Sequence, residues 1–302
     1  MLIWFVVIYL LVSVAIGLYA ATRVHNTKDF AVAGRRLPLP VVTATVFATW
    51  FGAEAVFGVS ATFVTNGLRG VVADPFGASL CLVIAGIFYG TTLYRLNVLT
   101  LGDFFRLRYN RSVEVLTTLC IVASYLGWVS AQIKALGLVF NVVTNGAIPT
   151  SAGMILGALI VLTYTSFGGM FAVAILDFVQ IGVVMGGMLY IGYLISGMTG
   201  GVDVVVNHAA AAGKLDFFPA GGAAEWLAFI AAWVTMMLGS IPQQDVFQRV
   251  TSAKSARIAI WASILGGALY FCFTFVPMFI AYSATLINPE QFNGLIETDS
   301  QL

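Results

Sequence analysis

Residues Thr45 to Ser60 read Thr-Val-Phe-Ala-Thr-Trp-Phe-Gly-Ala-Glu-Ala-Val-Phe-Gly-Val-Ser, a stretch within an apolar run that is long enough to cross a bilayer. Glu54 stands near its middle, where an ionised carboxylate costs about 2.5 to 3.5 kcal/mol on insertion scales and so marks function by default. Gly52 and Gly58 weaken the helix around it, which predicts a broken membrane helix whose freed backbone groups line a cavity. The alternative is that Glu54 is protonated, or bonds a neighbouring helix near one end, while the glycines serve close packing.

The composition of the whole chain points to the same environment. Apolar residues make up 60% of the sequence, charged residues 9%, and the mean hydropathy is +0.97. Soluble proteins contain about 45 to 50% apolar and about 25% charged residues. We therefore expect an integral membrane protein whose partner is the lipid bilayer, and we expect no nucleic-acid partner. The three cysteines lie in apolar runs without a pairing or metal-binding pattern.

Eight apolar segments are long enough to be membrane spans at about 20 residues each. They cover roughly 2–21, 40–65, 73–94, 113–140, 151–167, 172–198, 224–242 and 258–284. The first lacks a basic flank and is too long for a signal peptide, so we interpret it as a permanent helix.

The basic residues of the short loops predict the orientation. One side would hold Arg23, Lys28, Arg35, Arg36, Arg95, Arg106, Arg108, Arg111, Arg249, Lys254 and Arg257. The other side would hold only Arg69 and Lys214, together with an acidic tail of Glu290, Glu297 and Asp299. The sequence therefore predicts that the basic side is cytoplasmic, that both termini of this chain are external, and that the protein lies in the cell membrane.

Apart from Glu114 and Glu225 at helix starts, where the dipole favours acids, four ionisable residues fall within or at the edge of spans: Glu54, Asp74, Lys134 and Asp177. Asp74 precedes Pro75 and is equally well explained as a helix N-cap or as a residue of the cavity. Lys134 is better explained as a side chain that extends to the membrane surface. Tyr125, Trp128 and Gln132 share one helix face, a pattern that packing explains more often than binding. The candidate substrate-binding residues are Gly52, Glu54, Asp74, Tyr125, Gln132 and Trp233.

Three segments carry a resemblance to a known family. The first is Tyr-Thr-Ser-Phe-Gly-Gly-Met-Phe-Ala-Val-Ala-Ile-Leu-Asp-Phe-Val-Gln, residues 164–180. The second is Ile-Pro-Gln-Gln-Asp-Val-Phe-Gln-Arg-Val-Thr-Ser-Ala-Lys, residues 241–254, and the third is Thr-Leu-Gly-Asp-Phe-Phe, residues 100–105, followed by Arg108 and Tyr109. Together they resemble the solute:sodium symporter family, which includes proline, pantothenate, choline and sugar co-transporters. Along the chain the three segments follow one another in the same order as in that family.

The resemblance implies an all-α membrane fold built as an inverted repeat of five plus five core helices after one extra helix. On this basis residues 1–302 form a single transmembrane transporter domain. It would consist of the extra helix at 1–21, the first repeat at 40–198, and the start of an incomplete second repeat at 224–284. The fold would thus be truncated after about eight transmembrane helices. Span seven, the inverted counterpart of the Gly-broken span two, is itself interrupted by Gly239-Ser240-Ile241-Pro242.

The resemblance also implies the ion site. The sodium-binding residues would be the backbone carbonyls of Ala48 and Phe51, with Asp177 assisting sodium passage and further hydroxyls on an eighth core helix that the identified spans do not reach. The proline transporters carry an acid where this chain has Trp50, so proline specificity does not transfer.

We therefore expect a sodium-coupled symporter that imports a small polar organic solute by alternating access, with sodium as coupling ion and no cofactor. Glu54 and Asp74 favour an amine or quaternary ammonium, while a sugar or an amino acid stays open. The alternatives are a transporter-like sensory membrane module and a non-functional symporter fragment. No HExxH, GxSxG or P-loop motif occurs and both histidines lie in loops, so we do not expect an enzyme.

Overall fold

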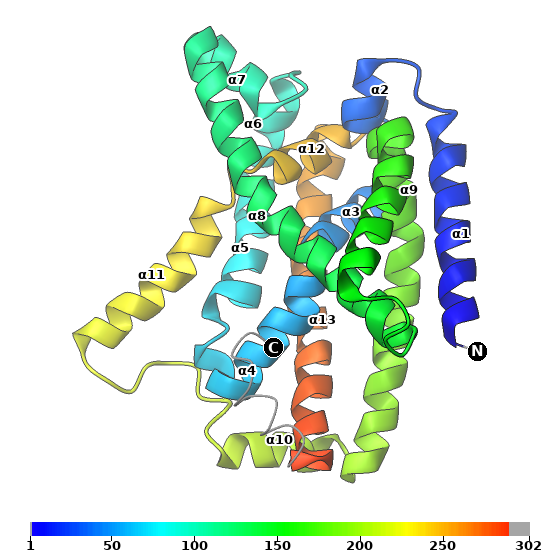
Figure 1. Cartoon of the computed structure of the whole chain (residues 1–302). Coiled ribbons are helices and arrows are strands. Elements are labelled where there is room, and N and C mark those ends of the chain that lie inside the picture. The colour runs from blue at the N-terminus through cyan, green and yellow to red at the C-terminus, as the bar shows by residue number, and fades with distance from the viewer. Residues whose placement is uncertain (1, 290–302) are drawn as a thin grey trace. The chain divides into compact units, whose positions relative to one another are not determined.

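The computed structural model describes residues 2–289, and in this range the secondary structure is helical apart from one isolated bridge between Leu37 and Ala253. The acidic tail residues Glu290, Glu297 and Asp299 lie outside the described residues. The helices, labelled as in Figure 1, are α1 (Leu2–Ala21), α2 (Thr27–Val32), η1 (Ala33–Arg35), α3 (Leu39–Trp50), η2 (Glu54–Val59), α4 (Ser60–Asn66), η3 (Gly67–Arg69), η4 (Val72–Gly77), α5 (Ala78–Ile84), η5 (Ala85–Tyr89), α6 (Gly90–Arg95), α7 (Leu101–Arg108), α8 (Arg111–Val143), α9 (Thr150–Thr199), α10 (Val202–Ala211), α11 (Ala223–Gly239), α12 (Gln244–Ser252) and α13 (Ala256–Ile287).

Five helices of the described chain are long and apolar enough to cross a membrane: Ile3–Ala21, Val72–Arg95, Arg111–Val143, Thr150–Thr199 and Ala256–Ile287. Two bent pairs, Leu39–Trp50 with Glu54–Arg69 and Ala223–Gly239 with Gln244–Ser252, raise this number to seven if each pair forms one span. The prediction of an all-α membrane protein is confirmed at this level. The prediction of eight spans and of a five-plus-five repeat stays a prediction.

The helix α9 explains part of the difference in span number. Its 50 residues would extend about 75 Å as one straight helix, more than twice the roughly 30 Å hydrocarbon core. The backbone leaves helical geometry at Gly169 (φ 49°, ψ −143°), at the paired glycines that separate the predicted spans 151–167 and 172–198. Only glycine adopts this conformation readily.

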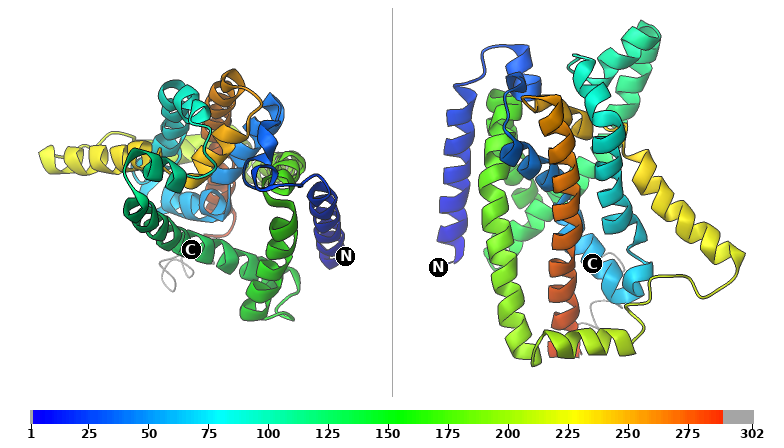
Figure 2. Two further views of the ribbon diagram at one scale, coloured as in Figure 1. Left: turned by 90° about the horizontal axis from the view of Figure 1, so that it is seen from above. Right: turned by 180° about the vertical axis from the view of Figure 1, so that it is seen from behind.

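The chain divides into two compact units, which are described separately. Unit 1 contains residues 2–46, 86–180 and 242–263, and unit 2 contains residues 47–85, 181–241 and 264–289. In unit 1, α8 is one long helix that begins after Asn110, whose side chain accepts a hydrogen bond from the backbone N–H of Val113 (3.0 Å). Helix α1 packs beside α9, because Gly17 lets Tyr164 approach closely (Figure 2).

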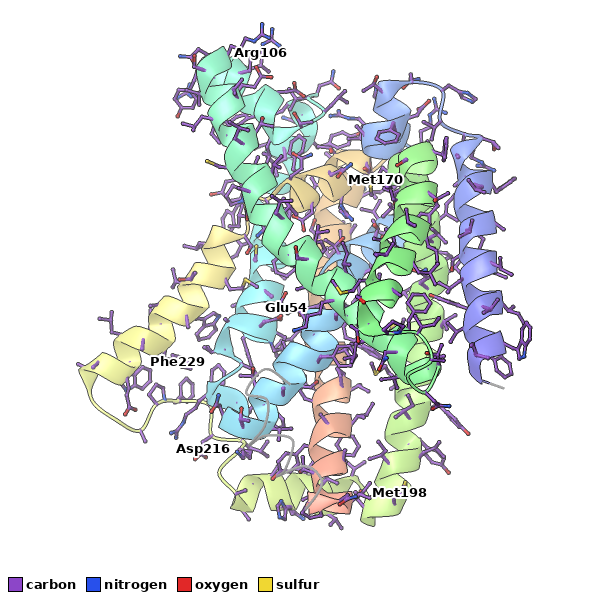
Figure 3. All side chains as sticks on the ribbon, in the orientation of Figure 1. Glu54, Arg106, Met170, Met198, Asp216 and Phe229 are labelled. Carbon is purple, nitrogen blue, oxygen red and sulfur yellow. The ribbon has the colours of Figure 1, made fainter. Side chains whose placement is uncertain are left out.

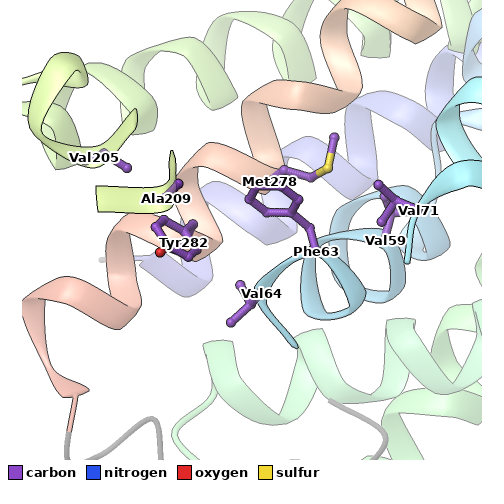
Figure 4. Close-up of a cluster of buried hydrophobic side chains, with 8 residues drawn as sticks. All are labelled: Val59, Phe63, Val64, Val71, Val205, Ala209, Met278 and Tyr282. Carbon is purple, nitrogen blue, oxygen red and sulfur yellow. The ribbon is translucent and has the colours of Figure 1, made fainter. Parts of the chain in front are cut away.

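Two clusters of buried side chains hold unit 2 together. The first consists of Val59, Phe63, Val64, Val71, Val205, Ala209, Met278 and Tyr282, which come from η2, α4, α10, α13 and the segment before η4 (Figure 4). The second consists of Phe47, Phe51, Ala55, Ala78, Tyr270 and Phe273. The second cluster surrounds the point where α3 ends, so the packing that stabilises unit 2 also fixes the break in span two.

Gly169 provides a test of the fold. A Cβ atom there would lie 2.5 Å from the carbonyl oxygen of Phe30, in a backbone region that costs other residues about 1 to 3 kcal/mol. We expect Gly169→Ala to lower the apparent melting temperature of the purified protein by several degrees. The matched control is Gly182→Ala on the same helix, where a Cβ meets nothing within 4 Å. Equal melting temperatures for the two variants would contradict the break at Gly169.

Candidate functional site

The break in span two lies where the sequence places it, between Trp50 and Glu54. Helix α3 ends at Trp50, the π-helical segment η2 begins at Glu54, and the two directions differ by 56°. The backbone N–H of Gly52 donates to the carbonyl of Trp50 (3.1 Å), only two residues earlier. In a regular helix this N–H would bond the carbonyl of Ala48. The regular ladder is therefore interrupted beside the two predicted sodium ligands, Ala48 and Phe51.

Asp74 lies at a second irregular point, inside the π-helical segment η4. Its backbone is non-helical (φ −137°, ψ 119°), and η4 contacts η2. The side chain accepts a hydrogen bond from the hydroxyl of Tyr270 on α13 (2.5 Å). No side-chain cap occurs at the start of η4 or of the following α5. Asp74 thus makes a tertiary contact and does not act as an N-cap, while its role as a residue of the cavity stays a prediction.

Aromatic rings pack against the ring of Tyr270, whose hydroxyl bonds Asp74. Trp50 and Phe51 each meet the ring of Tyr270 edge to face, with ring centroids 6.4 Å apart in both pairs. We call Asp74, Tyr270, Trp50 and Phe51 the Asp74 cluster. Tyr270 is fully buried, whereas Asp74 and Trp50 are partly exposed. A carboxylate and an indole ring within one cluster are groups that bind organic cations, through charge and cation–π attraction.

Glu54 occupies the first position of η2 (Figure 3) and its side chain is exposed within the described chain. The segment η2 contacts η4, which carries Asp74, so the two carboxylates lie on neighbouring segments. Gly52 lies partly buried at the break itself. These three candidate residues therefore belong to one region of unit 2.

Trp233 lies on α11 in an aromatic group with Phe217 and Phe229, at centroid distances of 5.8 Å to each (Phe229 is labelled in Figure 3). Its indole Nε1 is buried without a hydrogen-bond partner in the described chain. The backbone of Trp233 lies against Gly77, three residues after Asp74, because α11 packs on η4. Trp233 thus borders the segment that carries Asp74.

Two other candidate residues belong to unit 1. The hydroxyl of Tyr125 donates to Oδ1 of Asp245 (2.8 Å) and accepts from the backbone N–H of Asp245 (3.1 Å), so it connects α8 to the start of α12. Gln132 lies partly buried two turns further along α8, and Lys134 is exposed, as expected for a side chain that extends outward.

Asp177 also belongs to unit 1, where its Oδ2 accepts a short hydrogen bond from the hydroxyl of Thr45, which is fully buried on α3. Arg249 lies on α12 in the same unit. Of the predicted sodium residues, Asp177 thus lies in unit 1, and Ala48 and Phe51 lie in unit 2. Carbonyl, carboxylate and hydroxyl oxygens are the ligands that hard cations prefer, so the chemistry of these groups suits Na⁺.

Sequence reasoning missed Tyr270, the hydrogen-bond partner of Asp74, and Asp245, the partner of Tyr125. The only local signal for Tyr270 is a phenol within a mainly apolar span, 196 residues after Asp74, and Tyr282 gives the same signal in that span. No periodicity connects residues that far apart.

Membrane-length helices that are broken beside polar groups, with a carboxylate held near the break, define the class of secondary transporters. The sequence profile of the sodium:solute symporter family matches residues 30–295. The chain therefore belongs to the sodium:solute symporter family, as its motifs predicted.

Individual relatives support this assignment. The high affinity choline transporter 1 of Homo sapiens is 29% identical over 278 residues, which cover 86% of this chain and 46% of the relative. The corresponding transporter of Drosophila melanogaster is 27% identical and covers 96% of this chain and 47% of its own length. The sodium-coupled monocarboxylate transporter 1 of Homo sapiens is 25% identical over 85% of this chain. These relatives are transporters and not enzymes, and the chain spans about half of their length.

The fold is similar to that of a solved structure, the substrate-bound outward-open state of a Na⁺-coupled sialic acid symporter. The TM-score is 0.79 at 20% sequence identity, over 95% of this chain and 60% of the other. This likeness shows that the described helices share the fold of that structure.

Proposed function

We propose that the protein is a sodium-coupled symporter that imports a small, positively charged organic solute, an amine or a quaternary ammonium, by alternating access. The observation that carries this proposal is the Asp74 cluster, in which a partly exposed carboxylate and the indole of Trp50 lie beside the break in span two. Membership of the family and the likeness to choline transporters support sodium coupling and a cationic solute. Sodium binding would order the broken helix so that the solute binds better, and the coupling is reciprocal by linkage.

In this proposal the carbonyls of Ala48 and Phe51 bind sodium at the interrupted ladder, and Asp177 assists sodium passage. The proposed substrate-binding residues stay Gly52, Glu54, Asp74, Tyr125, Gln132 and Trp233. The bond to Asp245 gives Tyr125 a structural contact as well. The protein lies in the cell membrane with both termini of this chain external. Residues 1–302 form one transporter domain of the five-plus-five fold, with the extra helix at 1–21, the first repeat at 40–198 and the start of the second at 224–284.

The test is uptake by proteoliposomes that contain the protein expressed from its complete coding sequence. Labelled choline, proline, lactate and sialic acid are supplied with an inward Na⁺ gradient, and K⁺ replaces Na⁺ in the control. We expect choline to accumulate above its external concentration only with the Na⁺ gradient. Accumulation that ignores sodium, or that occurs only with the anions or proline, would overturn the proposal. Sodium-dependent choline binding without accumulation would favour the sensory-module alternative.

A further inference from the structure

We infer that Tyr270 is the positioning residue of the solute site: it holds Asp74 as an ionised, oriented counter-ion for the cationic group of the solute. The inference rests on the proposed function and deepens it. Tyr270 comes from α13, far in sequence from the predicted site residues, and its hydroxyl donates to Oδ1 of Asp74 at 2.5 Å. Such a bond to an ionised acceptor is short and about twice as strong as one between neutral groups.

The surroundings of the tyrosine leave it one orientation. Its ring is completely buried and meets Phe47, Trp50 and Phe51 at centroid distances of 6.4 Å each. A ring that is packed on several sides holds its hydroxyl in one position. Residues packed in this way orient the groups that bind a ligand.

The hydrogen bond occupies only one oxygen of Asp74. Within residues 2–289, Oδ2 of Asp74 accepts no hydrogen bond, and no ion pair involves this residue. An ionised carboxylate has acceptor sites on both oxygens. Tyr270 thus fixes the rotamer through Oδ1 and leaves Oδ2 for the cationic group of the solute.

Loss of the hydroxyl would weaken cation binding in two ways. The carboxylate would lose the bond that favours its charged form, and its side chain would have to be ordered when the solute binds. The hydrogen bond also withdraws some negative charge from the carboxylate, so its loss would in this respect strengthen cation binding. We expect the first two effects to dominate, because a partly buried carboxylate without any donor is poorly stabilised.

The variant Tyr270→Phe removes only the oxygen and keeps the packed ring. The chain offers a matched control on the same helix, Tyr282→Phe. Tyr282 is also buried (5% exposed), packs on Phe63 at 5.8 Å, and has its hydroxyl 3.0 Å from Nδ1 of His208. Each substitution thus deletes one phenol oxygen that contacts a side chain from another helix, Asp74 for Tyr270 and His208 for Tyr282.

The probes are choline and its neutral isostere 3,3-dimethylbutan-1-ol, whose binding to the purified protein is measured by calorimetry in sodium buffer. We expect Tyr270→Phe to weaken choline binding about tenfold, equivalent to about 1.4 kcal/mol, with the affinity for the neutral alcohol unchanged. Tyr282→Phe should leave the ratio of the two affinities as in the wild type. In an Asp74→Asn background, Tyr270→Phe should have no further effect on choline binding, because it acts through that carboxylate.

The outcomes separate the two proposals. If the wild type binds choline no better than the neutral alcohol, the cationic solute is wrong and the role of Tyr270 fails with it. If the wild type prefers choline but Tyr270→Phe keeps that preference, or weakens both probes equally, only the positioning role is overturned. An additional choline loss from Tyr270→Phe in the Asp74→Asn background would likewise overturn it.

Discussion

Asp74→Asn is expected to raise the choline concentration for half-maximal sodium-driven uptake by at least about tenfold, a factor that corresponds to about 1.4 kcal/mol. A carboxylate about 4 Å from a cation contributes roughly 4 kcal/mol at an effective dielectric constant near 20, and the partial exposure of Asp74 lowers that value. Asparagine keeps the shape, and its carbonyl oxygen can still accept the hydrogen bond from Tyr270. The change therefore removes charge with little effect on packing.

Two further variants make the measurement specific. Asp203→Asn alters an exposed acid on α10 of the same unit, and we expect uptake to be unchanged. Glu54→Gln should give a smaller loss than Asp74→Asn, because water screens the exposed Glu54 side chain more strongly. Equally small effects of Asp74→Asn and Asp203→Asn would show that Asp74 is not the counter-ion. An effect of Glu54→Gln no larger than that of Asp203→Asn would return Glu54 to the packing interpretation.

Features that depend on neighbouring residues were predictable from the sequence. Helix α8 runs from Arg111 to Val143 where the hydropathy predicted 113–140, since Asn110 caps its start and the chain turns at Asn145. Span two breaks between Trp50 and Glu54 because Gly52 lies there. The paired glycines after residue 167 mark the kink in α9 for the same local reason. In each case length, hydropathy and a turn residue are sufficient.

The partners of the candidate residues were not predictable in this way. Asp74 meets Tyr270 across 196 residues, Asp177 meets Thr45 across 132, and Tyr125 meets Asp245 across 120. Helical periodicity shows which residues share a face, but it does not show which faces meet in the folded chain. The sequence therefore identifies Asp74 as an unusual acid. Only the structure shows its hydrogen bond to Tyr270, which distinguishes a tertiary contact from an N-cap.

Asp177→Asn should raise the sodium concentration for half-maximal uptake by about fivefold or more while protein expression stays normal. Even in bulk water, charges 4 Å apart interact by about 1 kcal/mol, which corresponds to about fivefold in affinity. Asparagine keeps an oxygen that can accept the hydrogen bond from Thr45, so we expect a moderate change rather than loss of transport. The measurement is the sodium dependence of solute uptake at saturating solute.

Thr45 separates an ion-binding role of Asp177 from a structural one. Thr45→Val removes the hydroxyl that bonds the carboxylate and should shift the sodium dependence in the same direction by a smaller amount, because the charge remains. Thr45→Ser retains the hydroxyl and should restore the wild-type dependence. If Asp177→Asn changes the sodium dependence of uptake no more than Asp203→Asn does, Asp177 acts in packing alone. The bond to Thr45 would then serve to join α3 to α9, since both partners are held within unit 1.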